Sequence, residues 1–256
     1  MKRVVIVGGA GRMGQTLAPG LAASEGIEIE ALVDVLEPRE LGGARYAHRL
    51  GDLDASRIDV VVDFSTPDGV VRSATWCEQH GVALVVGATG LDSVQRAVVE
   101  QAATRVGVVI SANYSIGAIL SERFAALAAP YFERVEIIEL HHDRKVDAPS
   151  GTSIATAIAI AAAREEAGLP TMSDPTNRST IEGARGAQAP GGVKIHSVRL
   201  PGLTAHQEVL FGGPGEGLTI RHDSFDRSSF VHGVALAVRA VDSTPGLIDG
   251  IQSLVG

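Results

Sequence analysis

The stretch VVIVGGAGRMGQTL, residues 4–17, decides the fold expected for the first part of the chain. Its apolar start predicts a buried strand, and glycines at positions 8, 11 and 14 follow where a helix begins. Glycines let a backbone approach phosphates closely, and the N–H groups at a helix start favour an anion. A tight turn without a ligand also explains the glycines, but this context favours the pyrophosphate site of a Rossmann-type, dinucleotide-binding domain.

Further polar loops follow other predicted strands of the same region. Asp34 ends the second strand, where a carboxylate accepts hydrogen bonds from an adenine ribose. GATG at 87–90 and SANYS at 111–115 also follow predicted strands. Since open α/β folds bind ligands at the carboxyl edge of the sheet, these two loops are candidates to contact a nicotinamide.

The order of the predicted elements divides the chain into two domains. Strands alternate with helices in the first part, which predicts a parallel sheet. From residue 193 onward, strands follow one another with only short turns, which predicts a second, mixed sheet. The α/β chain should therefore have a dinucleotide-binding domain of residues 1–113 with 223–256, and a second α+β domain with an open mixed sheet, 114–222.

The predicted strands cover residues 4–7, 28–33, 60–64, 83–86, 108–111, 135–141, 194–200, 206–211 and 218–222. The predicted helices cover residues 14–24, 70–80, 93–105, 116–129 and 228–241, with an Ala-rich helix around 154–163. Residues 170–192 have no periodicity, and we expect a long functional loop there.

The composition excludes several classes of protein. A chain of 256 residues, 45% hydrophobic and 20% charged, buries a large core and is not disordered. A net charge of -8 without a basic run argues against nucleic acid as a partner. Cys77 is the single cysteine, and no apolar run reaches the roughly 20 residues of a membrane span. We expect a cytoplasmic protein with no membrane contact.

The densest chemistry lies in IIELHHDRKVDAPSGT, residues 137–152. It gathers His141, His142 and Lys145 just before a helix start that Ser150 can cap, where a carboxylate ligand can dock. A well-capped helix explains Ser150 alone but not the whole cluster. Paired histidines without further His or Cys do not match zinc patterns, and no GxSxG elbow is present, so we expect neither a metal site nor a hydrolase.

Four motifs together resemble one family: GGAGRMG at 8–14, GATG at 87–90, ANYSIGA at 112–118 and HHxxKxDAPSGT at 141–152. They are similar to the 4-hydroxy-tetrahydrodipicolinate reductase family, and the similarity continues through residues 195–234. The resemblance implies an NAD(P)H-dependent reductase of a cyclic C7 dicarboxylate in lysine and diaminopimelate synthesis. It also implies a homotetramer built through the second domain, which agrees with a sheet too small to close on itself.

The resemblance also implies roles for individual positions. It assigns acid/base chemistry to His141, proton donation to Lys145 and substrate contact to His142, while the residues alone leave the division between His141 and Lys145 open. Substrate carboxylate binding falls to Ser150, Gly151 and Thr152. The implied cofactor-binding positions are Gly8, Gly9, Ala10, Gly11, Arg12, Met13, Asp34, Gly87, Ala88, Thr89, Ser111, Ala112, Asn113 and Tyr114.

The charges near the second strand bear on cofactor choice. Asp34 favours a ribose with free hydroxyls, Arg12 partly offsets a 2′-phosphate, and Val35 adds no cation. We therefore expect NADH to be preferred and NADPH to be usable.

Two rival functions remain. One is another two-domain NAD-dependent amino-acid or sugar dehydrogenase, in which the basic cluster contacts a different anion. The other is a cofactor-sensing protein without catalysis, which leaves His141, His142 and Lys145 together unexplained.

Overall fold

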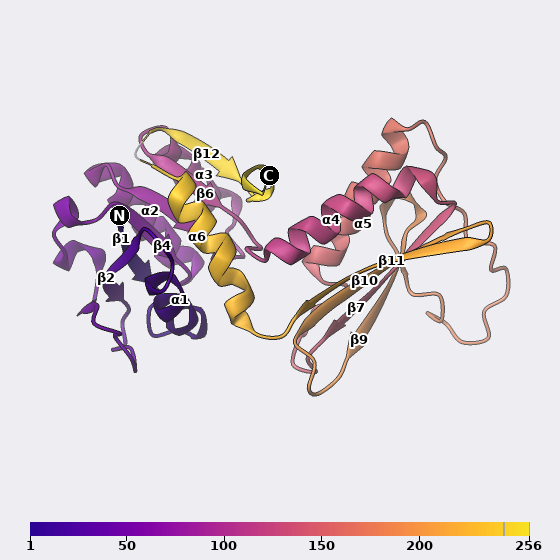
Figure 1. The fold of residues 1–256 in the computed structure, drawn as a ribbon, viewed down its shortest axis with the longest axis horizontal. Coiled ribbons are helices and arrows are strands. Elements are labelled where there is room, and N and C mark those ends of the chain that lie inside the picture. Colours follow the sequence, from indigo (N-terminus) through magenta and orange to yellow (C-terminus); the bar gives the residue numbers. More distant parts are fainter. Residues whose placement is uncertain (243, 256) are drawn as a thin grey trace. The chain divides into compact units, whose positions relative to one another are not determined.

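A computed structural model describes residues 1–242 and 244–255 (Figure 1). Spatial clustering divides the chain into two compact units. Unit 1 consists of Met1–Ile116 and Arg227–Gly256, and unit 2 of Gly117–Asp226. Both divisions fall slightly later in the chain than the predicted ones at 113 and 222. Within the described ranges, no helix combines the length and apolar character needed to cross a membrane.

Unit 1 contains a parallel sheet with the strand order β12-β6-β5-β4-β1-β2-β3. The strands are β1 (Lys2–Val7), β2 (Ile27–Val33), β3 (Arg45–Ala47), β4 (Val60–Asp63), β5 (Ala83–Val86), β6 (Gly107–Ile110) and β12 (Gly246–Asp249). The accompanying helices are α1 (Arg12–Ala22), α2 (Pro67–His80), α3 (Ser93–Ala103) and α6 (Val231–Ala240). The predicted Rossmann-type architecture is confirmed, while the edge strands β3 and β12 were not predicted.

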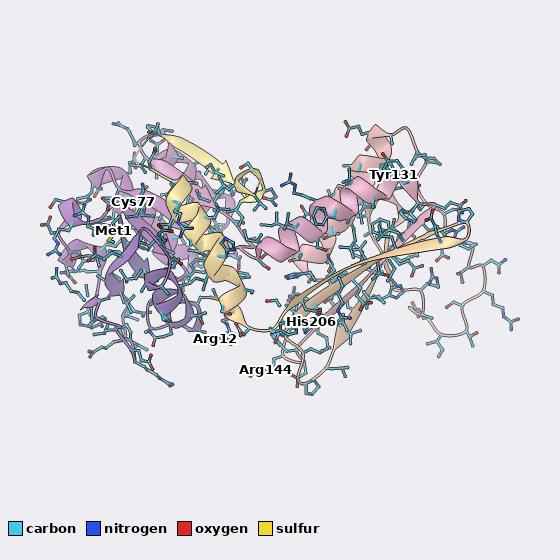
Figure 2. The ribbon with its side chains drawn as sticks, in the orientation of Figure 1. Met1, Arg12, Cys77, Tyr131, Arg144 and His206 are labelled. Atoms are coloured by element: carbon cyan, nitrogen blue, oxygen red, sulfur yellow. The ribbon has the colours of Figure 1, made fainter. Side chains whose placement is uncertain are left out.

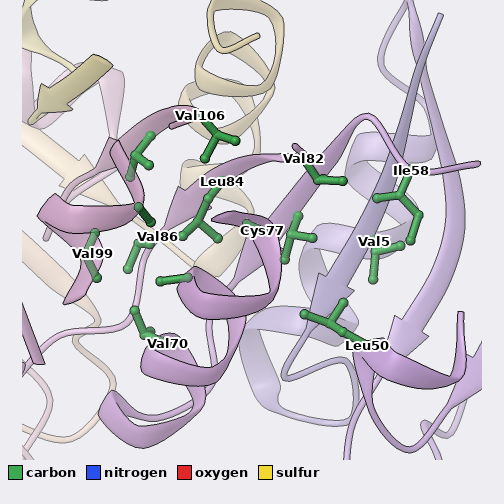
Figure 3. Packing of buried hydrophobic residues seen from close by; sticks show 14 of the residues in the cluster. Val5, Leu50, Ile58, Val70, Cys77, Val82, Leu84, Val86, Val99 and Val106 are labelled. Atoms are coloured by element: carbon green, nitrogen blue, oxygen red, sulfur yellow. The ribbon is translucent and has the colours of Figure 1, made fainter. Parts of the chain in front are cut away.

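The central strands of unit 1 are buried along their whole length. β4, β5 and β6 read VVVD, ALVV and GVVI, the continuous apolar pattern of strands covered on both faces. Val70 and Cys77 of α2 and Val99 of α3 pack on the same core (Figure 3). Cys77 has no exposed surface. This packing fixes the carboxyl ends of the strands, from which the polar loops extend.

Capping residues set the limits of two of these helices. Thr66 caps α2 by accepting a hydrogen bond from the Gly69 N–H at 3.2 Å, and Gly81 ends that helix with a φ of +69°. Asp92 and Gln95 form a capping box at the start of α3. These local signals explain why α2 and α3 begin directly after the loops that follow β4 and β5 at the carboxyl edge of the sheet.

Unit 2 contains an open mixed sheet with the strand order β11-β10-β7-β9-β8. Its strands are β7 (Arg134–His141), β8 (Ala187–Gln188), β9 (Lys194–Arg199), β10 (Ala205–Gly213) and β11 (Glu216–Ser224). β7 and β9 are parallel and the other pairs antiparallel, which confirms the predicted mixed sheet. Helices α4 (Ile116–Ala128) and α5 (Gly151–Glu166) form a core with it (Figure 1).

Short 3₁₀ turns complete the chain at Leu50–Asp52, Ala55–Arg57, Ala129–Tyr131, Pro190–Gly192, Arg227–Phe230 and Gln252–Leu254. The segment 170–192, which was expected to be one long loop, contains the short strand β8 and the 3₁₀ turn Pro190–Gly192. Ion pairs tie it to the sheet, because Arg185 pairs with Glu136 of β7 and Asp174 pairs with Lys194 of β9. It is therefore a partly structured connection.

Candidate functional site

The glycines between β1 and α1 are required by the close approach of backbone to backbone. Gly8 has a φ of +83°, which disfavours any side chain. A Cβ on Gly14 would lie 2.3 Å from the Gly8 carbonyl oxygen, and one on Gly9 would lie 2.8 Å from Cβ of Leu32. The turn thus forms a cradle without side chains at a helix start, which fits the pyrophosphate of a dinucleotide.

Asp34 is joined directly to this glycine turn. Its Oδ2 accepts a hydrogen bond from the Ala10 N–H at 2.9 Å, and its Oδ1 accepts one from the Leu36 N–H at 3.3 Å. The structure therefore brings together two motifs that the sequence placed on separate strands. Arg12, labelled in Figure 2, is exposed at the first position of α1.

A cavity of about 640 Å³ opens beside Asp34 and the glycine turn. Besides Gly8, Gly11 and Asp34, its lining includes residues that the sequence analysis did not propose: His48, Arg49, Phe64, Ser65, Thr66, Arg72, Ser73 and Trp76. Arg49 forms an ion pair with Asp52 at 2.8 Å. His48 and Arg49 were missed because they directly follow β3, a three-residue strand without a recognisable pattern.

The loops GATG at 87–90 and SANYS at 111–115, both at the carboxyl edge of the parallel sheet, meet at a second cavity of about 440 Å³. Thr89 of the first loop and Ser111 of the second line it, together with Arg96 and Asp249, which form an ion pair at 2.8 Å. The Ser111 hydroxyl donates to the Asn113 carbonyl oxygen at 2.7 Å, so this loop closes on itself. The two candidate nicotinamide loops therefore share one hollow.

The Tyr114 side chain of the second loop lies in the core of unit 1. Its side chain is fully buried, and its hydroxyl donates to the Val86 carbonyl oxygen at 2.7 Å. The ring packs near Phe64 and Phe230, with centroid distances of 5.6 and 6.4 Å. The Tyr114 side chain thus belongs to the core of unit 1, and only its backbone is left to contact a cofactor.

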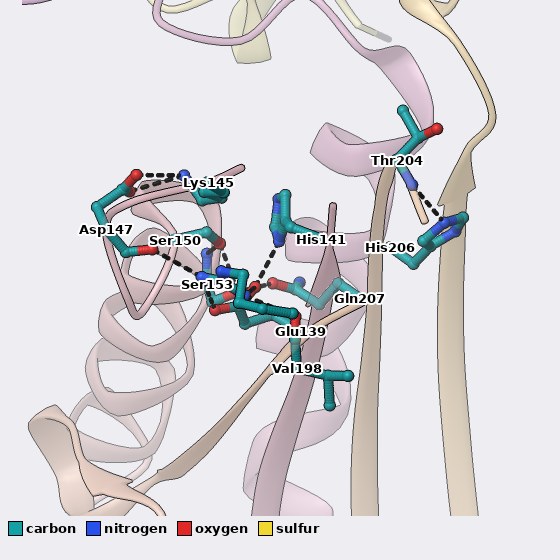
Figure 4. A network of polar contacts seen from close by, with 11 residues as sticks. Glu139, His141, Lys145, Asp147, Ser150, Ser153, Val198, Thr204, His206 and Gln207 are labelled. Atoms are coloured by element: carbon teal, nitrogen blue, oxygen red, sulfur yellow. Dashed lines mark hydrogen bonds and ion pairs between the residues drawn. The ribbon is translucent and has the colours of Figure 1, made fainter. Parts of the chain in front are cut away.

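The basic cluster of unit 2 begins at the end of β7, where His141 lies (Figure 4). The His141 Nδ1 atom forms a short hydrogen bond with Glu139, whose side chain is fully buried. Burial lowers the pKa of His141, and the negative charge of Glu139 offsets part of that effect. At neutral pH the imidazole is therefore poised in its uncharged form.

Lys145 lies in the loop that follows and contacts a carboxylate of the same loop. Its Nζ donates to both oxygens of Asp147, at 2.8 and 2.7 Å. The Lys145 hydrogen bonds lower the pKa of Asp147. His142 contributes a second imidazole, and among the described residues its buried Nδ1 has no hydrogen-bond partner. The loop therefore holds a cation at Lys145 and a buried imidazole nitrogen that has no partner among the described residues.

Ser150 caps α5, as the sequence predicted. Its Oγ accepts a hydrogen bond from the Ser153 N–H at 3.2 Å and lies 2.9 Å from the Ser153 hydroxyl. The Ser153 hydroxyl in turn donates to Gln207 Oε1 at 2.7 Å. Gly151 is exposed and Thr152 half-buried at the first positions of the helix. The first residue of the helix, Gly151, is therefore exposed to solvent, while the Ser150 cap is held by buried hydrogen bonds to Ser153.

His141 ends β7, Lys145 lies in the loop that follows and Ser150 caps α5, all within unit 2 (Figure 4). The sequence analysis missed Glu139, Arg199 and Asp147. Glu139 lies on the same face of β7 as His141, and a charged residue at a core position of a strand is the signal that would have revealed it.

Comparisons with known proteins cover both units. The family model described as dihydrodipicolinate reductase, N-terminus, matches residues 2–114, and the one described as dihydrodipicolinate reductase, C-terminus, matches residues 117–254. A 4-hydroxy-tetrahydrodipicolinate reductase from Cutibacterium acnes is 48% identical over 259 residues, covering 100% of this chain and 99% of that protein. The resemblance noted in the sequence is confirmed.

Solved structures agree. A dipicolinate-bound dihydrodipicolinate reductase from Paenisporosarcina sp. TG-14 matches with a TM-score of 0.86 and 38% identity, covering 99% of each chain. A myo-inositol 2-dehydrogenase from Lactobacillus plantarum matches with a TM-score of 0.62 and 14% identity, covering 99% of this chain and 93% of that one. The second likeness shows a shared fold alone. The first, with the family models, shows that the chain belongs to the dihydrodipicolinate reductase family of oxidoreductases.

Proposed function

We propose that the chain reduces 4-hydroxy-tetrahydrodipicolinate to tetrahydrodipicolinate with NAD(P)H and a proton, the 4-hydroxyl leaving as water, a step of diaminopimelate and lysine synthesis. The single observation that carries this proposal is the cluster of His141, His142 and Lys145 beside the start of α5. A dicarboxylate substrate is bound by cations and hydrogen-bond donors. Because the chain has a net charge of -8, the positive charge must be gathered locally at the site. Membership in the family supports the same substrate.

Unit 1 is proposed to hold the nicotinamide nucleotide, which supplies the hydride when bound. The glycine turn accommodates the pyrophosphate, and Asp34 accepts hydrogen bonds from the ribose hydroxyls. Asp34 is held at the turn by the Ala10 N–H, so its negative charge stays beside the ribose position. We expect NADH to bind more tightly than NADPH, which remains usable because Arg49 and Arg72 line the same cavity.

Unit 2 is proposed to bind the substrate and to supply the proton. The Lys145 ammonium attracts the dianion and donates the proton, and the substrate carboxylate replaces Asp147 as its partner. The backbone N–H groups of Gly151 and Thr152 hold a carboxylate at the positive end of the α5 dipole. His142 contacts the substrate, and His141 acts beside it at the end of β7.

We also propose that the protein is a homotetramer assembled through unit 2. The strands β11 and β8 end the open sheet, and an open sheet edge provides unpaired backbone groups for another chain. Light scattering at micromolar concentration should return the mass of four chains. A monomer mass would contradict this assembly.

A direct assay tests the function. Enzymatically generated substrate is supplied with NADH or NADPH, and the loss of reduced-nicotinamide absorbance is followed. We expect turnover with both cofactors, and turnover lowered by about 100-fold or more in Lys145→Met under the same conditions. Absence of activity with either cofactor would contradict the proposal, and oxidation of amino acids or inositols with NAD⁺ would favour the rival dehydrogenase function.

A further inference from the structure

A buried ion pair lies directly beneath His141 and takes no part in the chemistry proposed above. Both oxygens of Glu139 accept hydrogen bonds from Arg199, at 2.9 and 2.8 Å. Glu139 is fully buried, and Arg199 is 19% exposed. A bidentate pair of this kind keeps a carboxylate ionised and fixes its direction. Glu139 is therefore an acceptor only, although it lies at a core position of the sheet.

The geometry of the strands makes Arg199 and His141 neighbours on one face. His141 is paired in register with Arg199 of β9, and Glu139 with Ser197. Residues in such register point to the same side of the sheet, the side on which Glu139 is buried. The hydrogen bond between Glu139 and the His141 Nδ1 atom completes the group.

Arg199 also reaches the loop that carries Lys145. One of its guanidinium nitrogens donates to the Asp147 carbonyl oxygen at 2.7 Å, and the Asp147 side chain binds the Lys145 ammonium. One continuous network therefore runs from His141 through Glu139 and Arg199 to the loop (Figure 4). The two ends of this network are His141 and Lys145. The sequence alone did not decide which of these two residues transfers the proton.

We propose that Glu139 and Arg199 are positioning residues that hold His141 as its Nδ1–H tautomer and present its Nε2 atom as a hydrogen-bond acceptor. Since an ionised carboxylate can only accept, the proton between the two side chains belongs to His141 Nδ1. Neutral His141 then has no proton to give at Nε2. Lys145 is left as the proton donor, and His141 acts as the acceptor that orients the ligand.

The charges that face His141 agree with this assignment. Glu139 lies on its own strand, Arg199 on β9 and Lys145 on the loop, and the side chains of Ser150, Ser153 and Gln207 nearby are neutral. Arg199 and Lys145 both disfavour a charged imidazole, as burial does. Glu139 favours it, and the other carboxylate of the network, Asp147, is bound to the Lys145 ammonium, so loss of Glu139 should move the His141 titration to lower pH.

The first test needs no kinetics. The nitrogen and carbon-bound proton signals of ¹⁵N-histidine-labelled protein are recorded by NMR, and those of His141 are identified by their loss in His141→Gln. We expect the Nδ1–H tautomer in the unmodified chain. The Nε2–H tautomer there would overturn the proposal, whether or not any variant folds.

Glu136 supplies a matched control on the same strand. It is also a carboxylate that pairs with an arginine, Arg185, and a histidine, His196, but it points to the opposite face of β7. Glu139→Gln should lower the pH of the His141 titration and reduce its Nδ1–H population. Glu136→Gln should leave the His141 signals in place, and equal effects of the two changes would overturn the proposal.

A kinetic arm rests on the proposed function. Glu139→Gln should lower kcat by about tenfold or more, because it removes part of the rate enhancement that acid/base groups contribute. The affinity for NADH should be unchanged. Arg199→Lys, which keeps the charge, should lower kcat less than Glu139→Gln does, whereas Glu136→Gln should change kcat by no more than about twofold. Full activity of Glu139→Gln would contradict the positioning role. An inactive unmodified chain would contradict the proposed function, and the NMR result would then decide the network alone.

Discussion

The glycine turn of unit 1 and the His–Lys cluster of unit 2 are built on opposite principles. The turn depends on missing side chains, because a Cβ at Gly14 would meet backbone atoms of Gly8 and Gly9. The cluster depends on side chains that hold one another, with Glu139 bound by both Arg199 and His141. One site is therefore sensitive to added volume and the other to lost charge.

The contrast matches the two kinds of ligand that we propose. A pyrophosphate is bound by many backbone N–H groups at once, and glycine brings the backbone close. A proton must be transferred by a titratable side chain, and such a side chain must be oriented by others. Changes in unit 1 should therefore alter cofactor binding, while changes in unit 2 should alter turnover.

The largest effect is expected for Lys145→Met. Loss of the proton donor should lower kcat by about 100-fold or more, the range typical of general acids. The dissociation constant for NADH should stay near that of the unmodified chain, because the glycine turn is untouched. Stopped-flow turnover and calorimetric NADH binding measure the two quantities. Full turnover in this variant would remove Lys145 from the chemistry.

Gly14→Ala should have the reverse pattern. Its Cβ would lie 2.3 Å from the Gly8 carbonyl oxygen, so the turn must shift at a cost of about 1–3 kcal/mol, or roughly tenfold to 100-fold in NADH affinity. Turnover at saturating NADH should fall much less. Gly246→Ala is the control, since no described atom lies within 4 Å of its Cβ. Unchanged NADH binding by Gly14→Ala would show that the turn adapts.

Helix caps give a smaller contrast between the units. Ser150→Ala removes a buried cap that is bound to Ser153, and should lower the free energy of unfolding by about 1–2 kcal/mol. Asp92→Ala removes an exposed cap in unit 1 and should cost about 1 kcal/mol or less. Urea titrations compare the two. Only Ser150→Ala should also raise KM for the substrate, and a KM equal to that of the unmodified chain would argue against carboxylate binding there.

The smallest effect concerns the choice between cofactors. The Asp34 carboxylate should favour NADH by about fivefold to tenfold, or on the order of 1 kcal/mol. Asp34→Ala should narrow this preference, and Arg12→Ala should weaken NADPH more than NADH. Calorimetry with both cofactors measures the ratio. Tighter binding of NADPH by the unmodified chain would show that the arginines near the cavity outweigh Asp34.

Particular elements show how far the sequence reached. The central strands β1, β4 and β5 and the cap Ser150 follow from residues adjacent in the chain, through burial patterns and local hydrogen bonds. By contrast, β3 and β12 have three and four residues and depend on pairing with β2 and β6. Strands that short have no period of their own, so their prediction fails until the sheet is known.

The sequence by itself determined the glycine turn, the histidine and lysine motif and the family, because each is written in consecutive residues. Only the tertiary structure decided that Tyr114 is a core residue, that Arg49 lines the cavity beside Asp34, and that Arg199 supports His141 through Glu139. Glu139 and Arg199 are 60 positions apart and meet because β9 lies parallel to β7. Strand order sets such charge pairs, and the free energy that selects an order is spread over the whole core.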